Sequence, residues 1–113
     1  MLSKKYRLTK REDFYSVYKK GFCIEEDALL IKYLKSEQPL SRIGFSVSKH
    51  FSKKAVSRNR TKRVLQEVCR FYLPSLKNGF DIVITPRPNQ ERIEFNKTKD
   101  ILNNIFIKAN LFK

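Results

Sequence analysis

The stretch Arg42-Ile-Gly-Phe-Ser-Val-Ser-Lys-His-Phe-Ser-Lys-Lys-Ala-Val-Ser-Arg-Asn-Arg-Thr-Lys-Arg63 decides the fold, because a strand pattern within it leads directly into a basic helix. Apolar residues alternate with small or polar ones from residue 42 to residue 48, which is the pattern of a strand with two different faces. Ile43, Phe45 and Val47 share one face, and the other face carries little bulk around Gly44. This bare face suits a sheet surface that receives a ligand, and a solvent-exposed sheet face would look the same.

Positive charge is concentrated in the second part of this stretch. Residues 49–63 include seven Lys or Arg and no Asp or Glu. At the start of a helix such a run is unfavourable, because that end of the helix dipole is already positive. A polyanion that neutralises the run would explain it, whereas the alternative is a charged face that meets only water. The density of the unmixed run favours nucleic acid.

A helix is predicted over residues 55–73 from the positions of its side chains at about 100° per residue. One sector is apolar and consists of Val64, Leu65, Val68, Phe71 and Tyr72. The opposite side collects Asn59, Arg63, Gln66 and Arg70. Arg58 and Arg60 fall near the two borders of the apolar sector, so the Arg-Asn-Arg triplet should spread outward in three directions.

Two further helices and three further strands are predicted around this segment. Thr9 and Glu12 form the pattern of a capping box for a helix that runs to Lys20 and stops at a left-handed Gly21. The apolar stripe of this helix is Phe14, Val17 and Tyr18. Strands are expected over residues 22–26, 28–35 and 80–85, the last one buried on both faces. The final helix is expected from Glu94 to about Ala109, with the core stripe Phe95, Leu102, Ile105, Phe106 and Ala109.

The resulting order α-β-β-β-α-β-α indicates an α/β (α+β) two-layer sandwich, in which helices pack on a four-stranded mixed sheet. The passage from residue 42 to residue 85 is a strand-helix-strand unit. By the general rule, such a unit crosses over with a right hand.

Length and charge bound the function classes. A chain of 113 residues, 41% of them hydrophobic, forms one domain with one core. With 25 basic against 11 acidic residues the formal charge is +14, so nucleic acid is the first expected partner and an acidic membrane surface the second. No apolar run approaches the roughly 20 residues of a membrane span, and the N-terminus lacks the apolar segment of a signal peptide. Residues 1–8 are expected to form a short mobile basic arm.

The two cysteines and the acidic residues give little support to chemistry by the polypeptide itself. Cys23 and Cys69 form no metal-like or redox pair, and both are interpreted as reduced, partly buried thiols of a cytosolic protein. His50 is the only histidine, which excludes a two-histidine nuclease mechanism. The acidic run 25–27 could bind a divalent ion, but a charged hairpin turn is the favoured interpretation. The chain alone is therefore predicted not to be a catalyst.

The segments Gly44-Phe-Ser-Val-Ser-Lys49 and Lys54-Ala-Val-Ser-Arg-Asn-Arg-Thr-Lys-Arg63 closely resemble the bacterial ribonuclease P protein subunit, whose signature is the Arg-Asn-Arg helix. The likeness extends from about Tyr6, through Arg11-Glu-Asp-Phe14 and Tyr18, to the C-terminal helix. It implies a protein that assists a catalytic RNA, with Mg²⁺, in removing the 5′ leader of precursor tRNA. It also implies the fold of a ribosomal-protein domain with a left-handed crossover, one protein per RNA, and a cytoplasmic location.

The resemblance also implies roles for individual residues. The precursor-tRNA leader would lie in a cleft between the first helix and the open sheet face, in contact with Phe14, Tyr18, Ser46 and Lys62. RNA phosphates would be held by Arg58, Asn59, Arg60 and Lys62, and the basic ends of the motif are Lys49, Lys53, Lys54 and Arg63. Asn59 would lie near a bound metal ion. Periodicity alone leaves another interpretation of Phe14 and Tyr18, which is that both rings are core residues.

Two positions depart from the family pattern, and one alternative function is kept. Lys32 stands where a tyrosine is expected on the second strand, with Tyr33 next to it on the other face, and Gln66 stands where relatives often have a basic residue. The alternative is a ribosomal-type RNA-binding module without a role in tRNA processing. An autonomous nuclease has little support because the chain lacks the residues for it.

Overall fold

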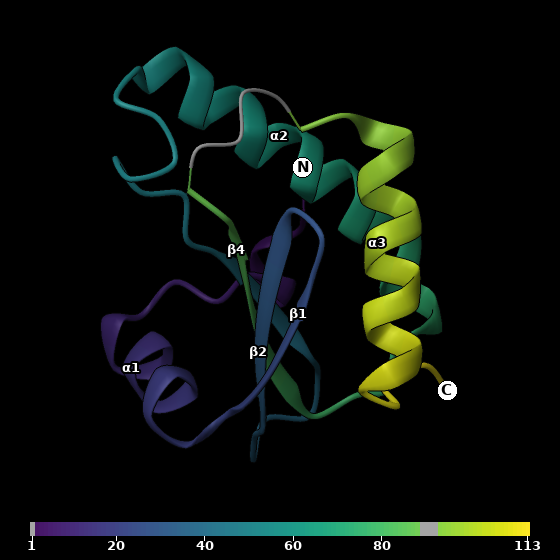
Figure 1. Cartoon of the computed structure of the whole chain (residues 1–113). Helices are drawn as coiled ribbons and strands as arrows, with labels where there is room; N and C mark the ends of the chain where they lie inside the picture. The colour runs from purple at the N-terminus through teal and green to yellow at the C-terminus, as the bar shows by residue number, and fades with distance from the viewer. Residues whose placement is uncertain (1, 89–92) are drawn as a thin grey trace.

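The computed structural model describes residues 2–88 and 93–113, which form one four-stranded sheet with helices on both faces (Figure 1). In chain order the elements are η1 (Lys4–Tyr6), α1 (Arg11–Lys20), β1 (Phe22–Glu26), β2 (Leu29–Lys35), β3 (Arg42–Phe45), α2 (Ala55–Tyr72), η2 (Leu73–Ser75), β4 (Phe80–Pro86) and α3 (Phe95–Lys108). The predicted order and the mixed sheet are confirmed. Within the described residues, no helix combines the length and the apolar character that crossing a membrane requires.

The sheet has the strand order β1-β2-β4-β3. β1, β2 and β4 pair antiparallel, whereas β3 and β4 pair in parallel, with Ile43 opposite Ile82. α2 is therefore the crossover between two adjacent parallel strands, and its left hand stays a prediction. β4 lies between β2 and β3, and its residues 82–84 are fully buried, as the strand's apolar composition predicted.

The main core lies between the sheet and the pair of helices α2 and α3. Leu65 and Val68 of α2 are fully buried in it, and so are Leu102, Ile105 and Phe106 of α3. Two predicted members of these stripes are wrong: Phe71 is 58% exposed, and Phe95 is 41% exposed. Each ring lies at an end of its helix, where it lines a surface hollow instead of the core.

A smaller core lies on the opposite face of the sheet, under α1. It consists of Leu8, Val17 and Val83, with Phe14 and Leu34 packed against them. Successive residues of β2 point to opposite faces of the sheet. Lys32, opposite Val83, therefore lies on the α1 face, and Tyr33, opposite Ile82, lies on the main-core face. α1 covers only part of this second face (Figure 1).

Both predicted ends of α1 need correction. The N-cap is Lys10 and makes no side-chain hydrogen bond, so the capping box of Thr9 and Glu12 does not form. The first turn is closed instead by the backbone carbonyl of Lys10, which accepts hydrogen bonds from two amides of the helix. Gly21 is extended (φ −76°) and not left-handed. Glycine is needed there because a Cβ would collide with the backbone carbonyls of Val17 and Tyr33.

The N-terminal segment is not a projecting arm. Leu2 is buried in the main core, and the backbone N–H of Leu8 donates to the carbonyl of Ile43, 3.0 Å away. Residues 2–8 therefore run along β3 and cover the exposed edge of the sheet, a common way to protect an edge strand. Both cysteines are free thiols, as expected, but the predicted partial burial is wrong: Cys23 is exposed, while Cys69 is wholly buried, which raises the pKa of its thiol.

Candidate nucleic-acid interface

The basic stretch between β3 and α2 is fixed to the core by one aromatic side chain. Phe51 is buried in the main core, while Lys49, Lys53 and Lys54 around it are exposed. Two serine turns hold the backbone: the Oγ of Ser48 accepts from the N–H of His50, and Ser52 makes the same contact with Lys54. The lysines are thus presented on a folded loop.

The first turns of α2 carry the Arg-Asn-Arg triplet on three sides. Asn59, Lys62, Arg63 and Gln66 line one shallow hollow of about 390 Å³, together with Val56. This set confirms the predicted grouping of Asn59, Arg63 and Gln66; Arg70 lies too far along the helix to join it. Residues 49–63 contain no carboxylate of their own, so the positive charge of the stretch is not balanced from within.

The two arginines of the triplet have different surroundings. Arg58 is turned toward the preceding loop, and its Nη1 donates to the backbone carbonyls of Ser52 and Lys53, both at 3.0 Å. Arg60 lies on the other flank of α2 and lines a separate hollow of about 580 Å³ beside Phe95. The sequence placed the two arginines on opposite borders but gave no signal that Arg58 holds the loop.

Phe14 and Tyr18, one turn apart on α1, are unequal in burial. Phe14 is half-buried, and its ring covers Gly44 so closely that a Cβ there would lie 2.5 Å from its Cζ. Tyr18 is 42% exposed, and the two ring centroids are 6.4 Å apart. Phe14 is therefore partly a core residue, whereas the ring of Tyr18 is exposed enough for a ligand to reach it.

The sheet beside Tyr18 carries positive charge and small side chains. The Nζ of Lys32 lies over the ring of Tyr18, 5.4 Å from its centroid. Gly44 and Ser46 follow one another on the same face of β3 and its continuation, and the N–H of Ser46 donates to the carbonyl of Ile84. The structure thus brings Phe14, Tyr18 and the β3 face together, whereas Lys62 lies in the hollow on α2.

An ion-pair cluster that the sequence did not reveal holds α1 on the sheet. Arg42 binds Asp81 through two hydrogen bonds, of 3.0 and 2.8 Å, and reaches Asp13 at 3.3 Å. The hydrogen bond with Asp81 is the main reason why the pKa of Arg42 is raised. Asp13 precedes Phe14, so this cluster sets how close α1 lies to β3. The sequence signal was weak, since the three residues are far apart in the chain.

The residues around Asn59 do not make a metal site of their own. Its neighbours in the hollow include the cations Lys62 and Arg63 and one further amide, without a carboxylate. Mg²⁺ prefers oxygen ligands, mainly carboxylate, phosphate and water. In the part of the chain that the structure describes, no group of three or more His, Cys, Asp or Glu could hold a metal ion. A metal ion near Asn59 would need its ligands from elsewhere, such as RNA phosphates.

The acidic residues at the β1–β2 hairpin confirm the favoured interpretation of a charged turn. Asp27 adopts the left-handed conformation (φ 50°) between the two strands. Glu25 pairs with Arg87, Glu26 with Lys108, and Asp27 with Lys97. The hydrogen bond with Lys108 lowers the pKa of Glu26. All three carboxylates therefore connect the hairpin to neighbouring basic residues.

Comparisons with known proteins agree with the resemblance seen in the sequence. A family model described as Ribonuclease P matches residues 2–110. The ribonuclease P protein component of a Picosynechococcus species is 37% identical over 111 residues, which cover 98% of this chain and 96% of that protein. The protein of the same name from a Pseudanabaena species is 41% identical over 112 residues, covering 98% and 97%.

Solved structures show the same architecture. The RNase P protein of Staphylococcus aureus superposes with a TM-score of 0.84 at 27% identity and covers 96% of this chain and 98% of that one. The RNase P protein of Thermotoga maritima gives a TM-score of 0.80 at 31% identity, covering 90% and 96%. Sequence and fold agree along almost the whole chain, and the chain therefore belongs to the ribonuclease P protein family.

Proposed function

We propose that this chain is the protein subunit of a ribonuclease P ribonucleoprotein, in which an RNA subunit removes the 5′ leader of precursor tRNA. The whole chain, residues 1–113, acts as one RNA-binding domain, with one protein per RNA, in the cytoplasm. It binds the leader and the RNA subunit, and Mg²⁺ acts mainly with the RNA. We expect no catalytic residue from the polypeptide itself, and in keeping with this no group of three or more His, Cys, Asp or Glu that could hold a metal ion occurs among the residues that the structure describes.

The observation that carries this proposal is the open ring of Tyr18 beside a cation on a sheet face lined by small residues. Aromatic rings stack on any base, so they suit a leader whose sequence varies. Lys32, 5.4 Å from the ring centroid, adds positive charge where the phosphates of a stacked nucleotide would lie. Phe14 forms the inner wall of this cleft and Ser46 part of its floor, while Lys62 contacts RNA from α2.

The basic stretch on α2 contributes the electrostatic part of binding. Lys49, Lys53 and Lys54 are exposed on the loop, and Arg60, Lys62 and Arg63 extend the charge along both flanks of the helix, with the neutral amide of Asn59 between them. We assign these residues to phosphates of the RNA subunit and of the substrate. Arg58 keeps the loop folded and adds its charge to the same surface. The relatives of this chain are ribonuclease P proteins, which does not favour a ribosomal-type module.

Reconstitution with the catalytic RNA tests this function. The wild-type protein should restore removal of the 5′ leader at physiological Mg²⁺, and the protein without RNA should leave precursor tRNA intact. Replacing Tyr18 with Leu removes the stacking ring, so the affinity of the holoenzyme for precursor tRNA should fall about five- to hundredfold. Mature tRNA has no leader, so its affinity should not change.

Tyr15 provides the matched control. Tyr15 also lies on α1, and the Nζ of Lys19 is 5.8 Å from the centroid of its ring. It is 62% exposed, however, and Lys32 of the sheet lies over the ring of Tyr18 instead. Tyr15→Leu should bind both RNAs like the wild type. An equal loss of affinity for precursor and mature tRNA in Tyr18→Leu would contradict the leader cleft. Failure of the wild type to restore cleavage would contradict the function itself.

A further inference from the structure

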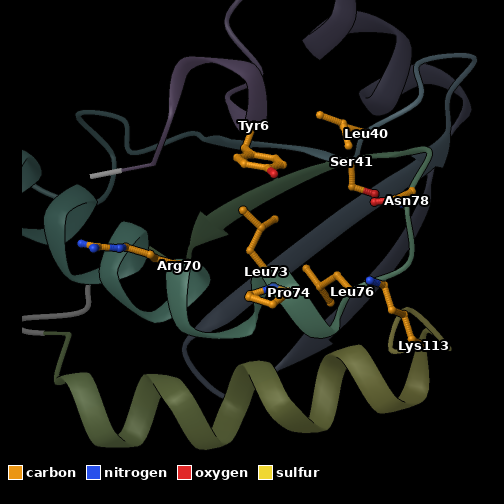
Figure 2. A pocket seen from close by; sticks show the side chains of 9 residues that line it. All are labelled: Tyr6, Leu40, Ser41, Arg70, Leu73, Pro74, Leu76, Asn78 and Lys113. Atoms are coloured by element: carbon orange, nitrogen blue, oxygen red, sulfur yellow. The ribbon is translucent and has the colours of Figure 1, made fainter.

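Two hollows meet at the C-terminal end of α2, far from the basic stretch. The first, of about 380 Å³, is lined by Tyr6, Arg70, Pro74 and Lys113 among others (Figure 2). The second, of about 520 Å³, is lined by Phe71, Pro74, Phe112 and Lys113 among others. Because Pro74 and Lys113 line both hollows, the two hollows form one continuous surface. We call it the aromatic–basic surface and define it by Tyr6, Arg70, Phe71, Pro74, Phe112 and Lys113.

Three aromatic rings of this surface are held in place and remain accessible. Figure 2 shows the ring of Tyr6 reaching from the N-terminal segment toward Leu73 and Pro74. Phe71 is 58% exposed, and the Nζ of Lys99 lies 3.9 Å from its ring centroid. Phe112 packs against Tyr72 and Phe106 at centroid distances of 5.7 and 5.6 Å while it lines the second hollow.

The charge around these rings is positive. Among the described residues, no Asp or Glu lines either hollow. Arg70 forms a loose ion pair with Glu67, because its Nη1 lies 3.9 Å from the Oε1 of Glu67 and both side chains are more than half exposed. Such an exposed pair contributes little to stability and leaves the guanidinium available to an anion. Lys99 and Lys113 add two more cations beside the rings.

We propose that the aromatic–basic surface is a second RNA-binding site, which takes a single-stranded segment of the RNA subunit. Rings that stack on bases and cations that meet phosphates are the two components of single-strand binding sites. A chain of charge +14 favours RNA over a protein partner, because the residues that line the two hollows include Arg70 and Lys113 and no carboxylate, which attracts a polyanion more strongly than a protein of mixed charge. That the bound RNA is the RNA subunit rests on the proposed function. That the surface binds single-stranded RNA rests on its rings and cations alone.

The position of this surface separates it from the basic stretch. Arg58 and Phe71 lie nearly four turns apart on α2, which is about 20 Å along the helix axis. A base pair step of RNA is several times shorter than this distance, so the two ends of α2 contact different parts of the RNA. α2 would then connect two RNA segments instead of lying on one.

A salt titration of binding to the catalytic RNA tests the cations. In the variant Arg70→Gln/Lys99→Gln, the slope of log affinity against log salt should decrease by about 1.4, because each single-strand phosphate that is no longer neutralised lowers it by about 0.7. The control is Lys19→Gln/Lys20→Gln, which removes two charges from the exposed end of α1 and should keep the wild-type slope. Equal slopes in the Arg70/Lys99 variant and the wild type would overturn the proposal.

Substitutions of Phe71 test the ring separately from the charge. Phe71→Leu should weaken binding to the catalytic RNA about five- to hundredfold at every salt concentration, and Phe71→Tyr should restore it because the ring remains. A thermal melt of each free variant checks folding. Wild-type affinity in a folded Phe71→Leu variant would overturn the proposal and leave this surface to a protein partner. If the variants bind the catalytic RNA as expected but the wild-type protein does not restore leader cleavage, the proposed function is contradicted while this RNA-binding site stands.

Discussion

At the scale of single residues, burial separates the roles of side chains that share one helical stripe. Phe14 and Tyr18 point from the same side of α1, but only Phe14 packs into the small core on the sheet, because β3 carries Gly44 beneath its ring. Tyr18 meets Lys32 instead and remains open. The absence of a side chain at residue 44 is thus what lets α1 approach the sheet and places the Tyr18 ring beside it.

Replacing Gly44 with Ala should lower the free energy of unfolding by about 1 to 3 kcal/mol, because the new Cβ would lie 2.5 Å from the Phe14 ring. Phe14→Leu shortens the opposing side chain, so the Gly44→Ala cost should be smaller in that background. Urea denaturation of the two single variants and the double variant measures this coupling. Additive losses of stability in the double variant would mean that the Phe14 ring does not rest on Gly44. Ser46→Ala, on the same face of the sheet, is the control and should leave the free energy of unfolding nearly unchanged.

At the scale of elements, both functional helices are fixed at one end by an arginine. Arg42 ties the first turn of α1 to β3 and β4 through Asp13 and Asp81. Arg58 ties the first turn of α2 to the loop before it through two backbone carbonyls. In each case a charged group orders a segment to which we assign RNA contacts, so the same guanidinium has a structural role and adds to the electrostatic field.

Arg58 and Arg60 should therefore differ when each is replaced by Ala. Arg58→Ala should lower the free energy of unfolding by about 1 kcal/mol, because two partly exposed hydrogen bonds to the loop disappear. Arg60→Ala should leave stability nearly unchanged and reduce the salt slope of RNA binding by about 0.7 to 0.9. Urea denaturation and a salt titration of binding measure the two effects. Equal stability of the two variants would contradict the loop-holding role of Arg58.

At the scale of the whole molecule, an unbalanced charge of +14 acts on a fold of 13.0 Å radius of gyration. Like charges at these separations repel, and this repulsion opposes folding when no polyanion is bound. Added salt screens the repulsion, since the Debye length falls from about 30 Å at 0.01 M to about 3 Å at 1 M. A bound RNA would act in the same direction by binding only the folded chain.

The melting temperature of the free protein should therefore rise between about 0.01 M and 0.5 M potassium chloride. The charge-reducing variant Arg70→Gln/Lys99→Gln should show a smaller rise than the wild type, because less repulsion remains to be screened. Thermal melts at several salt concentrations measure both. A melting temperature that falls with salt would show that the ion pairs, such as Arg42 with Asp81, outweigh the repulsion.

The order of elements, the mixed sheet and the basic stretch could be predicted from the sequence, because each depends on residue type and local spacing. The alternation around Gly44 and the helical stripe of Leu65 and Val68 are examples. The Arg-Asn-Arg motif also led directly to the family. Each single pattern lies within about twenty consecutive residues, so periodicity and charge density are enough to detect it.

The tertiary structure alone decided which of the predicted residues face solvent, ligand or core. Phe71 and Phe95 match a helical core stripe, yet both rings are more than 40% exposed and line surface hollows. Gly21 is required by the carbonyls of Val17 and Tyr33, and Arg42 finds its partners far away in the chain. Such contacts join distant segments, and the physical reason why periodicity misses them is that burial depends on what the folded chain places opposite each side chain.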